Sequence, residues 1–245
     1  MTRHELLVLM TVGMSTIAGS VMVVYTTMLA PIYGPGLIGH FLSASLISIP
    51  AGIMFANIMI PSEIKTDFPK EKSEDLFSNS MDAITQGTKN GLDIFLNVIA
   101  MLIVVMALIL LINAILGLLP NINELPITLE LILGYIFAPL AWFMGIPWSE
   151  AFAAGQLLGV KTALNEFVAY LYLSDSETYQ LSEKSRLIML YALCGFANFS
   201  SVGILLSGMS AMVPERRKDL ISVSGKALWG ALLASCLTGF MVGIL

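Results

Sequence analysis

Charged side chains are scarce in this chain of 245 residues. Lysine, arginine, aspartate and glutamate make up 12% of the sequence, and hydrophobic residues make up 57%. Ordinary soluble domains carry about 25% charged residues, so this composition excludes a soluble globular domain. The high hydrophobicity also excludes a disordered chain. The net charge of -5, without any basic stripe, excludes a nucleic-acid-binding protein. We therefore expect the lipid bilayer to be the chain's main partner.

Reactive motifs are also lacking. The two cysteines, Cys194 and Cys236, lie in apolar runs without the spacing of a disulfide framework or a zinc site. The sequence contains no nucleotide-binding Gly-x-x-x-x-Gly-Lys-Ser/Thr loop, no His-Glu-x-x-His zinc helix and no Gly-x-Ser-x-Gly elbow. We therefore expect that this protein is neither an enzyme nor an ATP-driven pump, and that it has no catalytic residue and no cofactor.

Long apolar runs predict membrane-spanning helices, because a hydrocarbon core about 30 Å thick needs about 20 helical residues. The predicted spans cover about residues 5–30, 38–60, 91–119, 185–212 and 222–245. Between the third and fourth spans lies a block, residues 126–173, that looks too broken for two plain spans. Its apolar runs are interrupted by Pro139, Gly145, Pro147, Gly155 and Gly159. The predicted fold class is an all-α polytopic membrane protein.

The distribution of lysine and arginine predicts the orientation, since cytoplasmic loops carry an excess of both. Basic residues gather at Arg3 and in the segments 60–90 and 213–226, whereas the linkers 31–37 and 120–126 carry none. We predict that Arg3 and both basic segments face the cytoplasm. Residues 61–90 would then form a cytoplasmic or interfacial linker, which includes Lys65, Lys70, Lys72 and Lys89.

Two ionisable residues, Lys161 and Glu166, stand out inside the broken block. Ionisable groups in membrane segments are costly, and those present usually face a bundle interior or an aqueous cavity. A carboxylate in such a place can accept hydrogen bonds from sugar hydroxyls or release a proton during transport. The alternative is a structural ion pair between Lys161 and Glu166.

A second polar cluster lies in the middle of the fourth span, where Gly195 and Gly203 bracket Asn198, Ser200 and Ser201. A glycine-flanked polar patch at mid-membrane is typical of a helix that unwinds around a ligand. On an intact helix, Asn198 and Ser201 would share one face. The alternative is packing between helices through small and polar residues.

A third patch, residues 13–21, lies in the first span and contains three hydroxyl side chains. Hydroxyls and freed carbonyls there offer the oxygen donors that a hard cation such as sodium prefers. The alternative is that these hydroxyls bond to their own helix backbone, as serine and threonine often do in membrane helices.

Taken together, these patches resemble the C-terminal part of the concentrative nucleoside transporter family, the NupC-like nucleoside:cation symporters. The matching stretches are MSTIAGSVM (14–22), HFLSAS (40–45), GVKTALNEFVAY (159–170), YALCGFANFSSVG (191–203) and PERR (214–217). The resemblance covers essentially the whole chain. It implies a multi-pass homotrimer in the bacterial inner membrane that imports nucleosides with sodium or protons through an elevator-type movement.

The resemblance also implies how the chain is divided. Residues 1–60 would be the first two spans of the transport domain, the first of them unwound, and residues 61–90 the linker. Residues 91–126 would form a long scaffold helix with trimer contacts. Residues 127–173 would hold an interfacial helix and a re-entrant hairpin, with its tip at Asn165 and Glu166. Residues 174–245 would hold the last two spans, the first unwound near 195–203.

Site residues carry over from the family one by one. Three match positions that bind ribose hydroxyls: Glu166, Asn198 and Ser201. Phe196 matches an aromatic side chain near the sugar, and Val21 matches an apolar contact to the base. Two match sodium-ligand positions in the unwound first span: Thr16, and Ile17 through its carbonyl.

One part of the family pattern has no match. The family has an N-terminal half with a first hairpin, whose Gln-Thr-Glu-like tip holds the base and completes the cation site; this chain contains no Gly-Gln-Thr-Glu segment. We therefore expect the chain to be the C-terminal part of a transporter, with the N-terminal half as a candidate separate chain. The alternative is a non-transporting truncated remnant or a subunit of a split transporter. Sodium versus proton coupling and base preference stay open.

Overall fold

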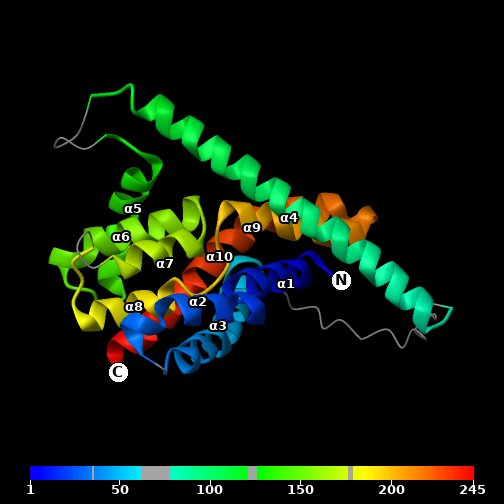
Figure 1. Ribbon diagram of the computed structural model, residues 1–245, viewed down its shortest axis with the longest axis horizontal. Coiled ribbons are helices and arrows are strands. Elements are labelled where there is room, and N and C mark those ends of the chain that lie inside the picture. The colour runs from blue at the N-terminus through cyan, green and yellow to red at the C-terminus, as the bar shows by residue number, and fades with distance from the viewer. Residues whose placement is uncertain (35, 62–77, 121–125, 176–178) are drawn as a thin grey trace.

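The computed structural model describes residues 1–34, 36–61, 78–120, 126–175 and 179–245, and within these ranges the chain is all-helical without a β-strand (Figure 1). The helices are α1 (Arg3–Ser15), α2 (Gly19–Tyr33), α3 (Leu37–Met59), α4 (Ser80–Leu116), α5 (Leu129–Phe143), α6 (Trp148–Ala163), α7 (Glu166–Ser174), α8 (Glu183–Ala192), α9 (Phe199–Met212) and α10 (Arg217–Ile244), with a 3₁₀ turn at Pro214–Arg216.

Among the described residues, four helical stretches are long and apolar enough to cross a membrane. They are Arg3–Tyr33, Leu37–Met59, Ser80–Leu116 and Pro214–Ile244. They correspond to four of the predicted spans, and the remaining one, 185–212, is divided between α8 and α9. The prediction of an all-α membrane protein is confirmed.

Two of the predicted spans are broken helices. The first is interrupted between α1 and α2, where Thr16 is extended with φ -102° and ψ 170°. The second is interrupted at residues 193–198, between α8 and α9, where Gly195 has φ +146°. This second break, called the α8–α9 break below, starts and ends earlier than the predicted 195–203. The reason is local: the Asn198 side chain caps α9, so the residues after it are helical.

The two breaks lie against each other in the middle of the bundle. A side chain at Gly195 would place its Cβ 2.6 Å from the backbone carbonyl oxygen of Ser15. The carbonyl at the end of α1 therefore occupies the space that any other residue would fill at position 195. The positive φ of Gly195 adds a second reason for glycine at this crossing.

Helix α4 starts earlier than expected and lies along the outside of the bundle (Figure 1). The predicted span began at residue 91, but the helix begins at Ser80, after Asn79 caps it by accepting the Asp82 N–H. The end of the predicted 61–90 linker is therefore helical. The 37 residues of α4 correspond to a helix about 55 Å long, which is longer than a bilayer core is thick. Residues 62–77, with Lys65, Lys70 and Lys72, lie outside the described residues.

The block 126–173 folds as two helices and part of a third, α5, α6 and α7, and only two of its five predicted interruptions, Gly145 and Pro147, lie between helices. Helix α5 continues through Pro139, and α6 continues through Gly155 and Gly159. These glycines serve packing: a Cβ at Gly155 would lie 2.7 Å from the backbone nitrogen of Ala138, so α5 and α6 approach closely. The chain turns at residues 144–147, as predicted, and at 164–165.

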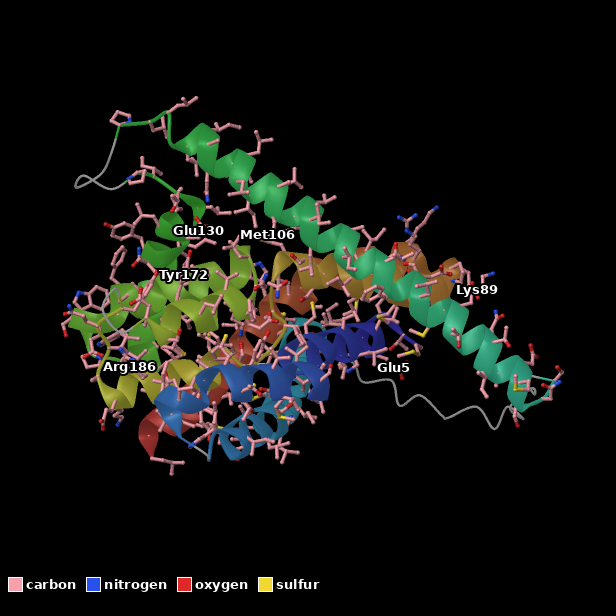
Figure 2. All side chains as sticks on the ribbon, viewed as in Figure 1. Glu5, Lys89, Met106, Glu130, Tyr172 and Arg186 are labelled. Atoms are coloured by element: carbon pink, nitrogen blue, oxygen red, sulfur yellow. The ribbon has the colours of Figure 1, made fainter. Side chains whose placement is uncertain are left out.

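Helix α4 packs along α9, and hydrogen bonds near its C-terminal end attach it to α5. Asn113 Nδ2 donates to both carboxylate oxygens of Glu130, at 3.2 and 3.0 Å, and Asn113 Oδ1 accepts the Leu129 N–H at 2.8 Å. Figure 2 marks Glu130, Met106 and Tyr172, which line a cavity of about 520 Å³ between α4, α5, α6 and α7. Neither Asn113 nor Glu130 was singled out from the sequence.

The ends of three helices meet on one side of the bundle. Arg3 Nη2 donates to Ser222 Oγ at 3.1 Å, and His4 Nδ1 lies 2.5 Å from the carbonyl oxygen of Ile60. The start of α1, the end of α3 and the start of α10 are therefore neighbours. This agrees with a topology in which Arg3 and the two basic segments share one face of the membrane. The orientation of that face toward the cytoplasm stays a prediction.

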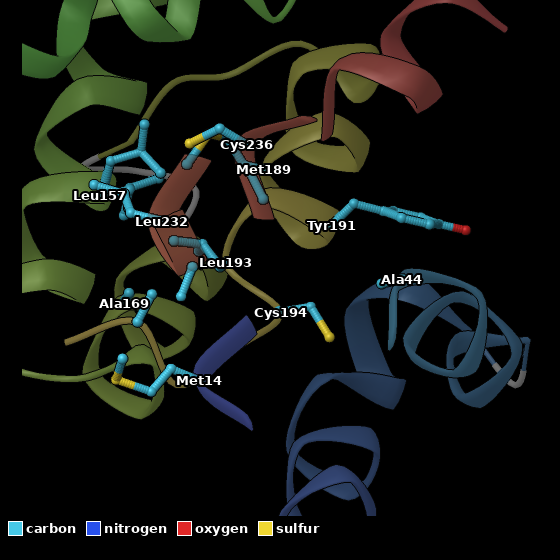
Figure 3. Packing of buried hydrophobic residues seen from close by; sticks show 14 of the residues in the cluster. Met14, Ala44, Leu157, Ala169, Met189, Tyr191, Leu193, Cys194, Leu232 and Cys236 are labelled. Atoms are coloured by element: carbon cyan, nitrogen blue, oxygen red, sulfur yellow. The ribbon is translucent and has the colours of Figure 1, made fainter. Parts of the chain in front are cut away.

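One apolar core connects the hairpin of α6 and α7 to the broken helices. Figure 3 shows buried side chains from α1, α6, α8, the α8–α9 break and α10 converging: Met14, Leu157, Met189, Leu193 and Leu232. Helix α10 packs on α1, α3 and α8, so it supports both breaks from behind. The polar residues described next are therefore embedded in a packed interior.

Replacing Gly195 by alanine tests the crossing of the two breaks. We expect Gly195→Ala to lower stability by at least about 2 kcal/mol, because the new Cβ meets the Ser15 carbonyl and the backbone keeps a positive φ. Gly208→Ala is the matched control, since nothing lies within 4 Å of its Cβ. Thermal unfolding in detergent measures both. Equal melting temperatures for the two variants would contradict this crossing.

Candidate functional site

The tip of the α6–α7 hairpin places Glu166 inside the protein. Helix α6 ends at Ala163, and Asn165 caps α7 by accepting the Val168 N–H at 3.0 Å. Glu166 is thereby the first residue of α7 and is only 5% exposed. A negative charge at a helix N-terminus is favourable, because the free backbone N–H groups point toward it. The tip lies where the sequence predicted it.

Both carboxylate oxygens of Glu166 accept a hydrogen bond from a neighbouring helix. Asn198 Nδ2 donates to Oε2 at 2.9 Å, and the Tyr25 hydroxyl donates to Oε1 at 2.8 Å. The structure thus brings together Glu166 and Asn198, two of the predicted ribose-binding residues. Tyr25 was not predicted. The sequence feature that could have identified Tyr25 is its position four residues after Val21, which places both on the same face of α2.

Asn198 uses both ends of its side chain. Its Nδ2 reaches Glu166, and its Oδ1 accepts the backbone N–H of Ser201 at 2.7 Å. Asn198 and Ser201 therefore meet through a helix cap and not as two side chains on the face of an intact helix. Both residues are buried, at 1% and 8% exposure. These two bonds fix which end of the amide faces the carboxylate.

The ion pair between Lys161 and Glu166, considered from the sequence, is not formed between these two described residues. Lys161 Nζ donates instead to the carbonyl oxygen of Ala192 at 2.8 Å and to Ser235 Oγ at 2.7 Å. The lysine is fully buried at 0% exposure. Lys161 and Glu166 therefore lie in the same region but contact different partners.

Val21 and Phe196 flank this site without a polar contact to it. Both are half-buried. Val21 lies on α2 and packs against the apolar core, one turn before Tyr25. Phe196 lies in the α8–α9 break, and its carbonyl accepts the Asn198 N–H at 2.9 Å. Their roles toward a base or sugar stay predictions.

The predicted sodium ligands, Thr16 and Ile17, lie in the break between α1 and α2. Thr16 Oγ1 donates to the Val12 carbonyl at 3.1 Å, as hydroxyls in membrane helices often do. A hydroxyl that donates its hydrogen still has oxygen lone pairs to offer a cation. The Ile17 N–H donates to Ser45 Oγ at 3.5 Å, which ties the break to α3. The geometry is compatible with the predicted site.

Known membrane transporters are similar to this chain over its whole length. YutK of Bacillus subtilis, described as an uncharacterized transporter, is 40% identical over 250 residues, covering 100% of this chain and 60% of that protein. The nucleoside permease NupC of Helicobacter pylori is 36% identical, covering 100% and 58%. Human solute carrier family 28 member 3 is 34% identical, covering 100% and 37%. This chain therefore spans about 60% of the length of these bacterial relatives.

Solved structures of CNTnw align with the whole chain. Its inward-facing, substrate-bound state is 36% identical with a TM-score of 0.78, covering 100% of this chain and 57% of CNTnw. A CNTnw variant in an intermediate state gives 38% identity and a TM-score of 0.78. The profile described as Na+ dependent nucleoside transporter C-terminus matches residues 40–243. The chain belongs to this nucleoside transporter family and corresponds to the C-terminal part of its members.

Proposed function

We propose that this chain is the C-terminal part of a nucleoside:cation symporter, in which Glu166, Asn198 and Ser201 bind the ribose. The observation that carries the proposal is the buried Glu166 carboxylate, which meets Asn198 where the hairpin tip touches the α8–α9 break. Several relatives are named transporters or permeases, and NupC of Helicobacter pylori is named for nucleosides. The proposed activity is transport and not catalysis.

The chemistry of the site fits a sugar with neighbouring hydroxyls. A carboxylate oxygen accepts two hydrogen bonds, and each Glu166 oxygen has one protein donor. A ribose hydroxyl can therefore donate to Glu166 while it accepts from the Asn198 amide. The half-buried Val21 and Phe196 offer apolar surface for the base and the sugar ring. Such sites combine apolar walls with a few fixed polar groups.

We propose sodium as the coupling ion. The support is the family profile, which describes a Na+ dependent transporter, and the break that leaves Thr16 and Ile17 half-buried beside α3. Thr16 would supply its hydroxyl oxygen and Ile17 its carbonyl oxygen. In this scheme the sodium gradient, and not ATP, drives uptake. The proton is the competing coupling ion, with Glu166 as the carboxylate that would carry it.

We further propose that α4 is the scaffold of a homotrimer in the bacterial inner membrane. Many of its apolar side chains are exposed, and they form a surface suited to other subunits: Leu92, Phe95, Leu96, Ile103, Leu110 and Leu111. The re-entrant hairpin α6–α7 and the interfacial helix α5 would move with the remaining helices as an elevator. CNTnw has been solved in inward-facing, intermediate and outward-facing states.

Glu166→Gln tests the proposed function. We expect it to abolish uridine uptake, because the neutral amide offers one acceptor oxygen and cannot accept from Tyr25, Asn198 and ribose together. Uptake is measured in vesicles under a sodium gradient and, separately, a proton gradient, with the chain expressed from its complete native reading frame.

Glu150→Gln is the control for that experiment. Glu150 lies at the other end of the same hairpin and bonds to Ser182, so at least half of the uptake should remain. Full uptake by Glu166→Gln would refute the site. Uptake that depends on the proton gradient alone would refute sodium coupling.

Tyr25→Phe tests the unpredicted member of the site. Loss of its hydroxyl leaves Glu166 Oε1 without this donor, so we expect uridine affinity to fall about tenfold while the protein stays folded. Tyr191→Phe is the matched control, because this buried tyrosine bonds to His40 and not to Glu166. Equilibrium binding of labelled uridine distinguishes them. Equal affinities in both variants would remove Tyr25 from the site.

A further inference from the structure

We propose that Lys161 is a positioning residue: it holds the α8–α9 break against the hairpin and keeps Asn198 within reach of Glu166 while the sugar binds. This inference rests on the proposed function, because it assigns a role within the same site. It starts from a buried cation that the binding chemistry above does not use.

Lys161 contacts the break at its beginning. Ala192 is the last residue of α8, and its carbonyl oxygen accepts from Lys161 Nζ at 2.8 Å. The last carbonyls of a helix have no partner within the helix and must find one elsewhere. A cation is also favoured at a helix C-terminus. The ammonium therefore satisfies the carbonyl at the point where α8 stops.

The hairpin contacts the other end of the α8–α9 break through Glu166. Lys161 lies in the last turn of α6 and Glu166 begins α7, so the two residues flank the hairpin tip. Glu166 receives the amide of Asn198, which caps the start of α9. The two sides of one tip thus hold the two ends of one break. Tyr170 adds a contact further back, donating to the Leu190 carbonyl at 2.8 Å.

Sugar binding changes only one of these two attachments. A ribose hydroxyl that donates to Glu166 Oε2 shares this oxygen with the Asn198 amide. The attachment through Lys161 involves no group that the sugar replaces. It therefore keeps the break in register with the hairpin while Glu166 and Asn198 adjust to the bound hydroxyl.

Helix α10 fixes Lys161 from behind. Ser235 Oγ donates to the Leu232 carbonyl at 3.0 Å, so its lone pairs accept from Lys161 Nζ at 2.7 Å. Burying an ammonium is costly, whereas a methionine of similar length would fill the same space without that cost. Lys161→Met therefore separates donation to Ala192 from simple filling of space.

The native Cys194 reports on the break without any added probe. It lies within the break and has 0% exposure. In a Cys236→Ala background, we expect Lys161→Met to increase the rate of Cys194 alkylation by N-ethylmaleimide at least fivefold. Ser235→Ala leaves the Ala192 contact in place and should change the rate less than twofold. Equal rates for Lys161→Met and the parent would overturn the proposal.

Uridine binding gives the second readout. We expect Lys161→Met to weaken affinity about tenfold and to leave the thermal unfolding midpoint within a few degrees, with partial recovery in Lys161→Arg. A residue that only fills space would change stability and not affinity, and that result would overturn the proposal. If the parent protein fails to bind uridine, the proposed function is wrong, while the Cys194 rates still test the role of Lys161.

A variant that does not fold is covered by the same assay. If Lys161→Met does not accumulate, Lys161→Arg and Lys161→Gln are compared for Cys194 alkylation. Arginine keeps a charged donor, so its variant should react more slowly than the glutamine variant. The reverse order would overturn the proposal.

Discussion

The hydrogen bond between Glu166 and Asn198 is the interaction on which this structure depends. It joins a hairpin tip to the α8–α9 break inside an apolar core. Broken helices are tolerated at membrane depth only where protein or a cavity satisfies the freed backbone groups. Asn198 satisfies groups in both elements, since it caps α9 and donates to the Glu166 carboxylate in the hairpin. A single residue thus connects the local helix break to the candidate binding chemistry.

Four helix ends meet around this bond, and the charges match them. Lys161 lies near the C-terminal ends of α6 and α8, and Glu166 lies at the N-terminal end of α7, beside the start of α9. Each charge therefore stands where the helix dipoles favour it. The break between α1 and α2 crosses at Gly195, which packs on the Ser15 carbonyl. The proposed sugar and sodium positions consequently lie on two breaks whose backbones are in direct contact.

Sequence reasoning singled out some members of the candidate site but not others. Glu166, Asn198 and Ser201 stood out because polar residues in apolar runs are costly. Tyr25 did not, since a lone tyrosine in an apolar helix has the pattern of ordinary packing. Gly155 and Gly159 were interpreted as interruptions because glycine marks both helix ends and close helix contacts. The start of α4 was missed because its first turns are polar. The roles of Val21 and Phe196 came from the resemblance alone, whereas Thr16 and Ile17 lie in the patch 13–21 that the residues themselves had indicated.

The central claim is that Glu166 and Asn198 recognise the ribose and not the base. The most direct measurement is competition against labelled uridine by unlabelled uridine and by 2′,3′-dideoxyuridine, which keeps the base but lacks two ribose hydroxyls. When the analogue binds, the buried polar groups that would bond to the two hydroxyls stay unpaired. We therefore predict that 2′,3′-dideoxyuridine binds at least about a hundredfold more weakly than uridine. Equal competition by both compounds would contradict the account.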